Sequence, residues 1–285
     1  MYRPLQPCLH SGATPTLSER KVDRVEYGFQ DIIYEKKDAI ARITMNRPHV
    51  LNAFTGHTML ELIRAFNDAG RDNRIGVVVL TGTGDRAFSA GGDVNWEKDA
   101  RYDQNYDYFP NVHSAIACCL KPVIARINGY CIGGANHIAY YCDLSIAAEH
   151  AIFGQNGPRV GSPADGMVVS YLVRVIGAKK AREMWYLCRR YRAQEALQMG
   201  LVNAVVPYEK LDEEVDRWCE ELLALSPTCL RVLKASFERE FDYLRAPSFA
   251  VQRAVAPHYY ETDEALEGQR AFLEKRKPDF SRYRR

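Results

Sequence analysis

Two glycine pairs stand where main-chain amides could do chemistry. The first ends at Gly92, after the apolar segment 87–90, and the second ends at Gly134, before a helix expected to begin near Ala135. A main-chain N–H at such a turn is a fixed, non-titrating donor that can stabilise negative charge on a carbonyl oxygen. The second pair also gains from the positive end of the helix. Taken alone, each pair also fits an ordinary turn.

His137 lies in the helix expected after Gly134. An imidazole titrates near neutrality, so beside a reactive carbonyl it could deprotonate a water molecule for attack on that carbonyl. The alternative is a histidine that packs within its helix and is hydrogen-bonded to a carbonyl. The position just after the second glycine pair makes His137 a candidate base.

The elements that must position these residues alternate along the chain. Residues 31–45 predict a strand hairpin, residues 58–70 predict a helix with one apolar face, and residues 76–82 and 122–127 predict buried strands. The alternation continues to about residue 206. It indicates a layered α/β core with mostly parallel strands.

The last part of the chain is expected to be helical. Beyond Pro207 the pattern predicts helices over 209–225, 227–243 and 263–275. We therefore divide the chain into a flexible N-terminal arm over 1–27, an α/β core over 28–207 and a helical region over 208–285. The helical region is suited to packing on a neighbouring subunit.

Composition excludes several classes of protein. The 285 residues are 47% hydrophobic and 26% charged, which is typical of a globular protein with a substantial core. With 38 basic and 36 acidic residues, the net charge of +2 is too small for nonspecific binding of nucleic acid.

No run approaches the roughly 20 apolar residues of a bilayer span, and no secretory signal is evident. We expect no nucleic-acid partner, no membrane and a cytoplasmic location, with the eight cysteines as reduced core residues.

Several segments, in this order, resemble the crotonase superfamily of enoyl-CoA hydratases and isomerases. The three general ones are Asn46-Arg47-Pro48 with Asn52-Ala53-Phe54, the run from Ala87 to Asp93, and the run from Lys121 to Gly134. Further segments are most similar to 1,4-dihydroxy-2-naphthoyl-CoA synthases and 2-ketocyclohexanecarboxyl-CoA hydrolases; they are residues 153–162, 180–188, 199–203 and 274–280. The resemblance covers about residues 26–285.

This resemblance implies a fold, an assembly and a substrate class. The fold is an α/β spiral of ββα turns, as in ClpP-like proteins, followed by a C-terminal helical trimerisation region. Such trimers commonly pair into hexamers, so the expected partner is a second copy of the chain. The expected substrate is an acyl-CoA thioester, with coenzyme A as part of the substrate and with no metal and no covalently bound cofactor.

The resemblance assigns the two oxyanion-binding amides to Gly92 and Gly134. A hydratase of this superfamily adds water with the help of two glutamates, and the matching positions here hold His137 and Gly157. Neither residue offers a carboxylate, so plain hydration by the two-carboxylate route is disfavoured.

Similarity to the naphthoyl-CoA synthases implies a bicarbonate pocket. In those enzymes a glycine at the second glutamate position leaves room for bicarbonate to act as base, beside a glutamine, a threonine and a tryptophan. Gln155, Gly157 and Trp185 match this pattern, and Asn156 replaces the threonine.

The same similarity implies further proton-handling residues. Ser162 matches a serine, and Tyr260 matches a tyrosine that reaches in from a neighbouring subunit. The aspartate expected two residues after the serine is Ala164 here, with Asp165 one place further on. A bend in the loop would restore the carboxylate, whereas an unbent loop would point it elsewhere. Ser162 as a helix cap and Tyr260 as an interface aromatic are the structural alternatives.

Coenzyme A recognition is implied at three positions. Ala53 would lie beside the pantetheine, while Phe272 and Lys275 would meet the adenine and phosphates across a subunit boundary. The loop that follows Gly92 is rich in polar and aromatic residues. The candidates for an aromatic lid over a cyclic acyl group are Trp96, Tyr102, Tyr106 and Tyr108.

We therefore expect an enzyme that stabilises a thioester enolate and makes or breaks a carbon–carbon bond. Hydrolytic, retro-Claisen cleavage of a cyclic β-keto acyl-CoA is favoured because of His137, with Ser162, Asp165 and Tyr260 also handling protons. The first alternative is a bicarbonate-dependent 1,4-dihydroxy-2-naphthoyl-CoA synthase, a ring-closing lyase. The others are an enoyl-CoA hydratase or isomerase and a non-catalytic acyl-CoA-binding protein.

Overall fold

The computed structural model describes residues 23–24, 27–100, 108–164, 166–239 and 258–283. Within these residues the strands form a seven-stranded sheet of order β1-β2-β3-β4-β6-β8-β11 and a four-stranded sheet of order β10-β9-β7-β5. The strands are β1 (Asp23–Arg24), β2 (Ile32–Lys37), β3 (Ile40–Met45), β4 (Val77–Gly82), β5 (Ala87–Ser89), β6 (Val123–Ile127), β7 (Tyr130–Ile132), β8 (Leu144–Ala148), β9 (Ile152–Gly154), β10 (Arg190–Arg192) and β11 (Ala204–Val206).

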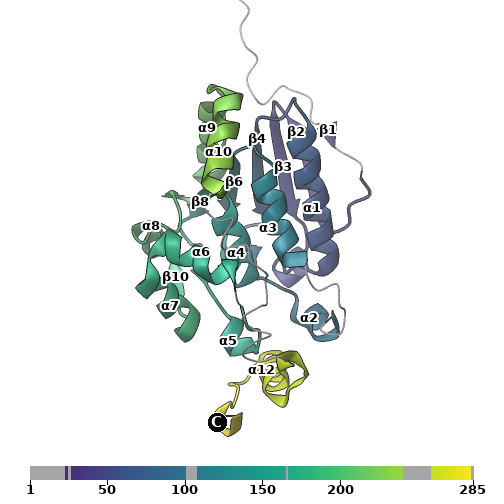
Figure 1. Cartoon of the computed structure of the whole chain (residues 1–285), viewed down its shortest axis with the longest axis vertical. Helices are drawn as coiled ribbons and strands as arrows, with labels where there is room; N and C mark the ends of the chain where they lie inside the picture. Colours follow the sequence, from purple (N-terminus) through teal and green to yellow (C-terminus); the bar gives the residue numbers. More distant parts are fainter. Residues whose placement is uncertain (1–22, 25–26, 101–107, 165, 240–257, 284–285) are drawn as a thin grey trace, which may run out of the picture.

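Helices cover these sheets (Figure 1). They are α1 (Gly56–Arg71), α2 (Val94–Ala100), α3 (Tyr108–Cys118), α4 (Gly134–Tyr141), α5 (Gly157–Val160), α6 (Met167–Ile176), α7 (Ala178–Leu187), α8 (Ala193–Gln198), α9 (Leu211–Leu223), α10 (Pro227–Arg239) and α12 (Asp263–Leu273). Short 3-10 turns are η2 (Pro48–Val50), η3 (Tyr208–Lys210), η5 (Tyr259–Glu261) and η6 (Ser281–Tyr283). The predicted layered α/β core is confirmed.

The first strands and helix follow from local chemistry. Asp38 and Ala39, with φ of 52° and 67°, form the left-handed two-residue turn that joins β2 to β3 in the predicted hairpin. Thr55 caps α1, because its hydroxyl accepts from the amide of Thr58 while the Thr58 hydroxyl accepts from the amide of Thr55. The helix predicted over 58–70 therefore begins two residues earlier and ends one residue later than expected.

The central strands of the large sheet are buried on both faces. Val78 and Leu80 of β4 pack into the main core with α1 and α3, whereas Val77 and Val79 pack with Leu211 of α9 on the opposite face. This two-sided burial explains the continuous apolar runs of β4 and β6, since a strand covered by helices on both faces needs no polar side.

The smaller sheet brings the site loops to one edge. Strands β5, β7 and β9 are parallel neighbours, and they end at Ser89, Ile132 and Gly154. Because the carboxyl ends of parallel strands meet at the same edge, the segments that follow them lie side by side. These segments carry Gly92, Gly134 and, after β9, the residues predicted for the bicarbonate pocket.

The C-terminal helices lie at two places. Helix α9 covers one face of the large sheet and α10 packs against α3, whereas α12 lies against α5 at the opposite end of the molecule (Figure 1). A methyl group added to Gly268 of α12 would lie 2.6 Å from the amide nitrogen of Gly161, so a glycine is needed for this close packing. The helix predicted over 227–243 begins as expected at Pro227 and continues at least to Arg239, beyond which residues 240–257 lie outside the described residues.

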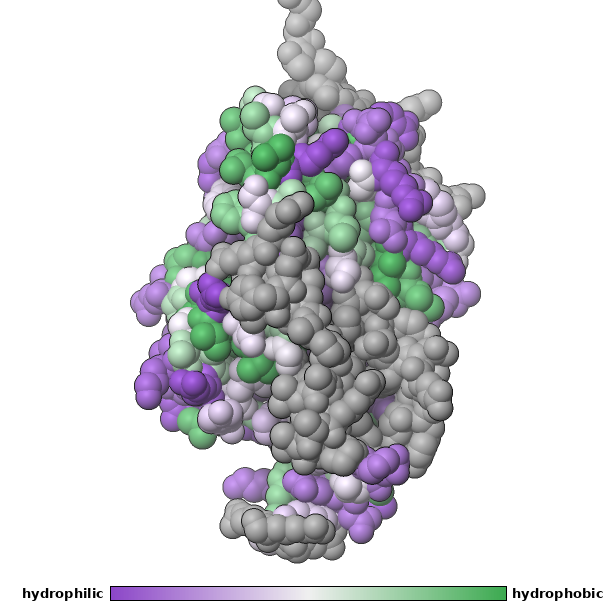
Figure 2. All heavy atoms as spheres, viewed as in Figure 1, coloured by the Kyte–Doolittle hydropathy of each residue, from purple (hydrophilic) through white to green (hydrophobic). Residues whose placement is uncertain are grey.

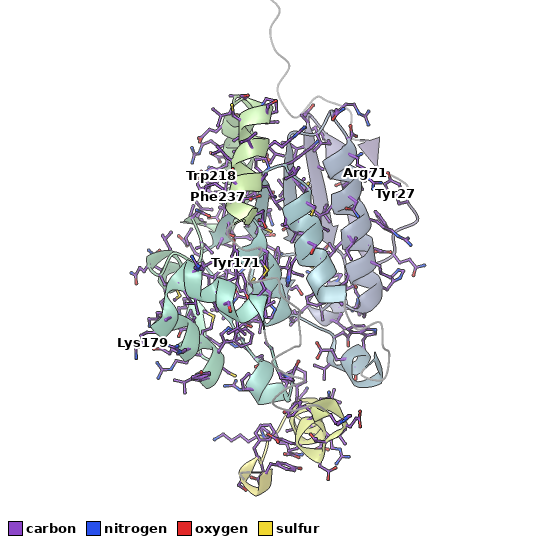
Figure 3. The ribbon with its side chains drawn as sticks, viewed as in Figure 1. Tyr27, Arg71, Tyr171, Lys179, Trp218 and Phe237 are labelled. Atoms are coloured by element: carbon purple, nitrogen blue, oxygen red, sulfur yellow. The ribbon has the colours of Figure 1, made fainter. Side chains whose placement is uncertain are left out.

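Helix α10 exposes large apolar side chains. Val232 is 59% exposed and Phe237 is 67% exposed, and Figure 2 shows apolar residues gathered over the α9 and α10 end of this face. Figure 3 places Trp218 of α9 and Phe237 of α10 at this same end. Such a surface is suited to a subunit contact, and the expected trimer or hexamer stays a prediction.

Three other expectations concern the whole chain. Of the N-terminal arm, Asp23 and Arg24 pair with β2 as an edge strand, and residues 1–22, 25 and 26 lie outside the described residues. Cys118 and Cys229 are exposed, so the prediction that every cysteine fills the core is wrong for these two. Within the described part of the chain, no helix combines the length and apolar character that a membrane span requires.

Candidate active site

A cavity of about 900 Å³ opens where the loops after β5, β7 and β9 meet. Most of the predicted site residues line it: Ala53, Gly92, Gly134, His137, Gln155, Asn156, Gly157, Ser162, Trp185, Phe272 and Lys275. They come from segments as distant in sequence as Ala53 and Lys275, so the fold gathers them at one place. This volume lies within the range of cavities that hold small molecules and cofactors.

The two glycine turns are adjacent in space. A methyl group added to Gly91 would lie 3.4 Å from the amide nitrogen of Gly134 and 2.7 Å from the carbonyl oxygen of Ile132. Gly91 and Gly133 have φ of 99° and 59°, which a residue with a side chain rarely adopts. Each turn therefore needs its first glycine.

The amides of Gly92 and Gly134 are available for a ligand. Both residues line the cavity, and among the described residues neither amide donates to a main-chain carbonyl. Gly134 is also the first residue of α4, where the positive end of the helix dipole favours negative charge. Two such donors side by side form a site for a carbonyl oxygen that gains negative charge.

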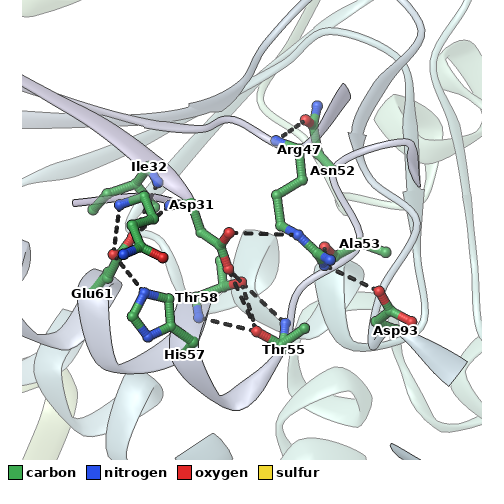
Figure 4. A network of polar contacts seen from close by, with 11 residues as sticks. Asp31, Ile32, Arg47, Asn52, Ala53, Thr55, His57, Thr58, Glu61 and Asp93 are labelled. Atoms are coloured by element: carbon green, nitrogen blue, oxygen red, sulfur yellow. Dashed lines mark hydrogen bonds and ion pairs between the residues drawn. The ribbon is translucent and has the colours of Figure 1, made fainter. Parts of the chain in front are cut away.

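Arg47 holds the loop that carries Gly92. Its Nη1 atom donates to the carbonyl oxygen of Ala53 at 2.6 Å and to Oδ2 of Asp93 at 3.1 Å (Figure 4). Its Nε atom lies 3.6 Å from Oδ1 of Asp31. Arg47 thus ties Asp93 to Ala53, in the neighbouring segment that is bridged to Gly92 through Phe54, which explains why the Asn46-Arg47-Pro48 segment belongs to the pattern.

His137 and Gln155 form a buried pair. Nε2 of His137 donates to Oε1 of Gln155 at 3.1 Å. Burial lowers the pKa of His137 to about 4, against the opposing effect of this hydrogen bond. The imidazole is therefore neutral near pH 7. The hydrogen bond also fixes the orientation of the Gln155 amide.

Two buried N–H groups at the cavity wall have no partner within the described part of the chain. They are Nε2 of Gln155 and Nε1 of Trp185, on side chains that are 0% and 7% exposed. The Trp185 ring lies 5.4 Å from the His137 ring, so one buried cluster carries both donors. Buried donors without an acceptor are costly, and a small anion in the cavity would satisfy them. The two residues fit a bicarbonate ion by their chemistry.

Gly157 has no room for a side chain. A methyl group there would overlap the carbonyl oxygen of Ser162 and would lie 3.7 Å from Cζ3 of Trp185. The amide of Ser162 in turn donates to the carbonyl oxygen of Gly157 at 3.0 Å. A carboxylate side chain at position 157 is therefore incompatible with this backbone.

A model of the enoyl-CoA hydratase/isomerase family matches residues 35–283. The chain belongs to the enoyl-CoA hydratase/isomerase family. It is thus a crotonase-superfamily enzyme of the kind that acts on coenzyme A thioesters, and the predicted crotonase fold is confirmed. The resemblance stated from the three general segments is confirmed at the level of the superfamily.

Solved structures of family members are similar to the chain. An enoyl-CoA hydratase from Mycobacterium avium subsp. paratuberculosis K-10 is 26% identical with a TM-score of 0.77, covering 88% of this chain and 98% of that one. An enoyl-CoA hydratase/carnithine racemase from Magnetospirillum magneticum is 30% identical with a TM-score of 0.71, covering 89% and 97%. A methylmalonyl-CoA decarboxylase in complex with 2-nitronate-propionyl-CoA is 27% identical with a TM-score of 0.79, covering 88% and 98%.

Some predicted site residues of this family member are not placed at the cavity. Asp165, Tyr102 and Tyr106 lie outside the described residues. Tyr260 belongs to the turn η5, but its side chain and that of Tyr108 lie outside what the structure describes. Trp96 packs, partly buried, against the main core and is not among the residues that line the cavity, and the aromatic lid stays a prediction.

The part of the cavity that was expected to bind coenzyme A differs from the expectation in one respect. Phe272 and Lys275 line the cavity of their own chain, so the structure brings them there without a subunit boundary. Arg190 also lines the cavity, and burial followed by repulsion from Arg159 lowers its pKa. The sequence analysis missed Arg190, which stands directly after the Lys180–Cys188 segment that carried part of the resemblance.

Glu97 is a second residue that the sequence analysis missed. It lines the cavity on α2, and a methyl group added to Gly92 would overlap its Oε1 atom and lie 2.8 Å from Cδ. Burial, followed by the negative charge of Asp93, raises the pKa of Glu97 to about 7. The signal in the sequence was the spacing of four residues from Asp93, which places both carboxyl groups on one face of a helix.

Proposed function

We propose that this family member forms an enolate of an acyl-CoA thioester and makes or breaks a carbon–carbon bond at that enolate. The observation that carries the proposal is the adjacent pair of amides at Gly92 and Gly134, combined with the absence of carboxylates at positions 137 and 157. The amides stabilise the enolate oxygen. Hydration needs acids and bases that these two positions do not supply.

Bicarbonate-dependent ring closure, as in a 1,4-dihydroxy-2-naphthoyl-CoA synthase, is the form of this chemistry that we put first. The unpartnered N–H groups of Gln155 and Trp185 support it, because a small anion beside Gly157 and Trp185 would supply an acceptor for these buried donors. Bicarbonate held there supplies the base for the α-proton. His137 holds Gln155 in the donating orientation.

Hydrolytic cleavage of a cyclic β-keto acyl-CoA is the second candidate. It is supported by the position of His137 at the cavity wall and by its neutral imidazole near pH 7, which could accept a proton from water. The low basicity of the ring, which follows from its pKa of about 4, places this candidate behind ring closure. The order is thus the reverse of the one that the sequence favoured.

Turnover with and without bicarbonate separates the candidates. o-Succinylbenzoyl-CoA and 2-ketocyclohexanecarboxyl-CoA are assayed in carbonate-free buffer and with added bicarbonate. We expect ring closure of the first compound to accelerate by about 10-fold or more with bicarbonate, as is typical when a general base is supplied. Cleavage of the second compound without any response to bicarbonate would favour hydrolysis.

A matched pair of variants tests the anion site. Trp185→Phe removes the buried N–H and keeps the ring, and it should abolish the response to bicarbonate. Trp218→Phe is the control, since the N–H of Trp218 donates to Glu214 on the outside of α9, away from the cavity. Hydration of crotonyl-CoA at a high rate would contradict the proposal. Thermal stabilisation by acyl-CoA thioesters without turnover of any of them would show a binding protein instead.

A further inference from the structure

Glu97 is a partly buried carboxylate that differs from Glu61 and Glu267, the buried carboxylates among the described residues. Glu61 accepts the main-chain amides of Gln30, Asp31 and Ile32 at 2.7–3.1 Å, and Glu267 pairs with Arg276 at 2.6 Å. Those two carboxylates have clear structural roles. Among the residues that the structure describes, no donor is hydrogen-bonded to the carboxyl group of Glu97. A polar group in this situation at a cavity wall calls for a functional explanation.

The Glu97 carboxyl group lies directly over the first oxyanion glycine. The overlap of its Oε1 atom with a methyl group added to Gly92 places it against the Cα atom of that residue, on the cavity side. A thioester oxygen bound by the Gly92 amide would therefore bring the reacting carbons close to Glu97. A protonated carboxyl group at this place can donate its proton to the enolate, whereas an ionised one would repel the enolate charge.

Asp93, the neighbouring carboxylate, affects the protonation of Glu97. Asp93 is paired with Arg47 at 3.1 Å and carries its negative charge on the same helical face, four residues before Glu97. Together with burial, this charge raises the pKa of Glu97 to about 7. A carboxyl group whose pKa is raised in this way commonly serves as an acid.

We propose that Glu97 is the catalytic acid that protonates the α-carbon of the enolate held by Gly92 and Gly134. This inference rests on the proposed enolate function in its cleavage direction, because the enolate that carbon–carbon cleavage leaves must gain a proton at its α-carbon, whereas ring closure forms a carbon–carbon bond there instead. The O–H bond of Glu97 breaks as its proton forms a C–H bond with the α-carbon. The electron pair of the enolate double bond makes that bond while the thioester carbonyl is restored. Glu97 is left as a carboxylate and takes up a proton from water.

Exchange of α-protons in D₂O tests this step by itself. Butyryl-CoA, which has no second carbonyl, is incubated with the enzyme and bicarbonate, and loss of the α-proton signal is followed by NMR. We expect the wild-type protein to exchange these protons, with a rate that falls as pH rises through about 7. Glu97→Gln should lower the rate by about 10²-fold and abolish this pH dependence, as expected for loss of a general acid.

Two further variants sharpen the test. Asp93→Asn removes the neighbouring negative charge while keeping the side-chain shape, so it should move the pH dependence of exchange toward lower pH. Glu220→Gln, on the exposed face of α9, should leave the exchange rate unchanged. Thermal stabilisation by butyryl-CoA should be equal in wild type and Glu97→Gln, which shows that binding survives.

The outcomes separate this inference from the proposed function. If α-proton exchange depends on Glu97 but neither ring substrate is turned over, the acid role of Glu97 is supported and the proposed carbon–carbon reaction is refuted. If the ring substrates are turned over and the exchange rate of Glu97→Gln is within threefold of the wild-type rate, the acid role of Glu97 is overturned. Absence of exchange in the wild-type protein, or tighter butyryl-CoA binding by Glu97→Gln at an unchanged exchange rate, would overturn it as well.

Discussion

Nε2 of His137 donates to Oε1 of Gln155 at 3.1 Å. Because Gln155 can only accept through this oxygen, the proton of the neutral imidazole is on Nε2, and the Gln155 N–H₂ group is turned away from the ring. Gln155 is fully buried and lines the cavity. A histidine that sequence alone suggests as a base thus acts on the site by orienting its neighbour.

Replacing His137 by glutamine should reduce the acid sensitivity of the fold. The folded chain takes up the His137 proton only near pH 4, whereas the unfolded chain takes it up near 6.5, so the unfolded state binds more protons between these values. The free energy of unfolding therefore rises with pH through this window, by on the order of 2–3 kcal/mol. Denaturant unfolding at pH 4.5 and 7.5 measures the difference. An identical fall in the wild type and in His137→Gln would contradict a buried neutral imidazole.

Removing the imidazole of His137 should impair binding of bicarbonate more than it impairs the chemical step. We expect His137→Ala to lower turnover by about 10-fold and to raise the bicarbonate concentration needed for half-maximal rate, because Gln155 loses its anchor. Steady-state kinetics at several bicarbonate concentrations checks this. A loss of about 10²-fold or more that bicarbonate does not alter would instead assign proton transfer to His137.

Gly157→Ala should destabilise the protein and impair the site. The added methyl group would overlap the Ser162 carbonyl oxygen, and a backbone atom cannot yield as a flexible side chain can. We expect a loss of about 1–3 kcal/mol in the free energy of unfolding, the usual cost of overpacking. Gly28→Asn is the control, because the space around Gly28 is open and asparagine tolerates its φ of 66°. Equal stability of the Gly157→Ala and wild-type proteins in urea would count against the close approach.

Arg47→Ala should loosen the segments of the cavity wall that carry Ala53 and Gly92. Arg47 is 17% exposed, and its loss leaves the Ala53 carbonyl and the Asp93 carboxylate without their shared donor. We expect a loss of about 2–3 kcal/mol in stability and a raised KM for acyl-CoA. Arg74→Ala is the matched control, since its ion pair with Asp72 is on a side chain that is 78% exposed and should be worth less than about 1 kcal/mol. Similar effects of the two variants on KM would contradict this role.

Lys275→Ala should weaken binding of the coenzyme A phosphates. Lys275 lines the cavity next to Phe272 at the end of α12, so an ammonium group there can pair with phosphate. We expect KM for an acyl-CoA to rise about 5-fold and KM for the matching acyl-pantetheine thioester, which lacks the nucleotide, to stay the same. Parallel changes for both thioesters would assign Lys275 to another role.

The sequence alone was sufficient for the family, the layered core and the glycine turns. Buried strands read as continuous apolar runs, and turns that need positive φ, such as those at Gly91 and Gly133, require glycine. Gly157 was also evident as a position without a carboxylate. These features are local, so a short stretch of residues determines each of them.

Only the tertiary structure decided which groups meet and which are charged. The pairing of His137 with Gln155 joins α4 to the loop after β9, and the place of Glu97 over Gly92 depends on how α2 packs. Burial then sets the pKa values of His137 and Glu97 in opposite directions, because it disfavours the charged form of each group. Distances between remote segments and the loss of solvent around a side chain arise only when the chain is folded, so no pattern of residue types could supply them.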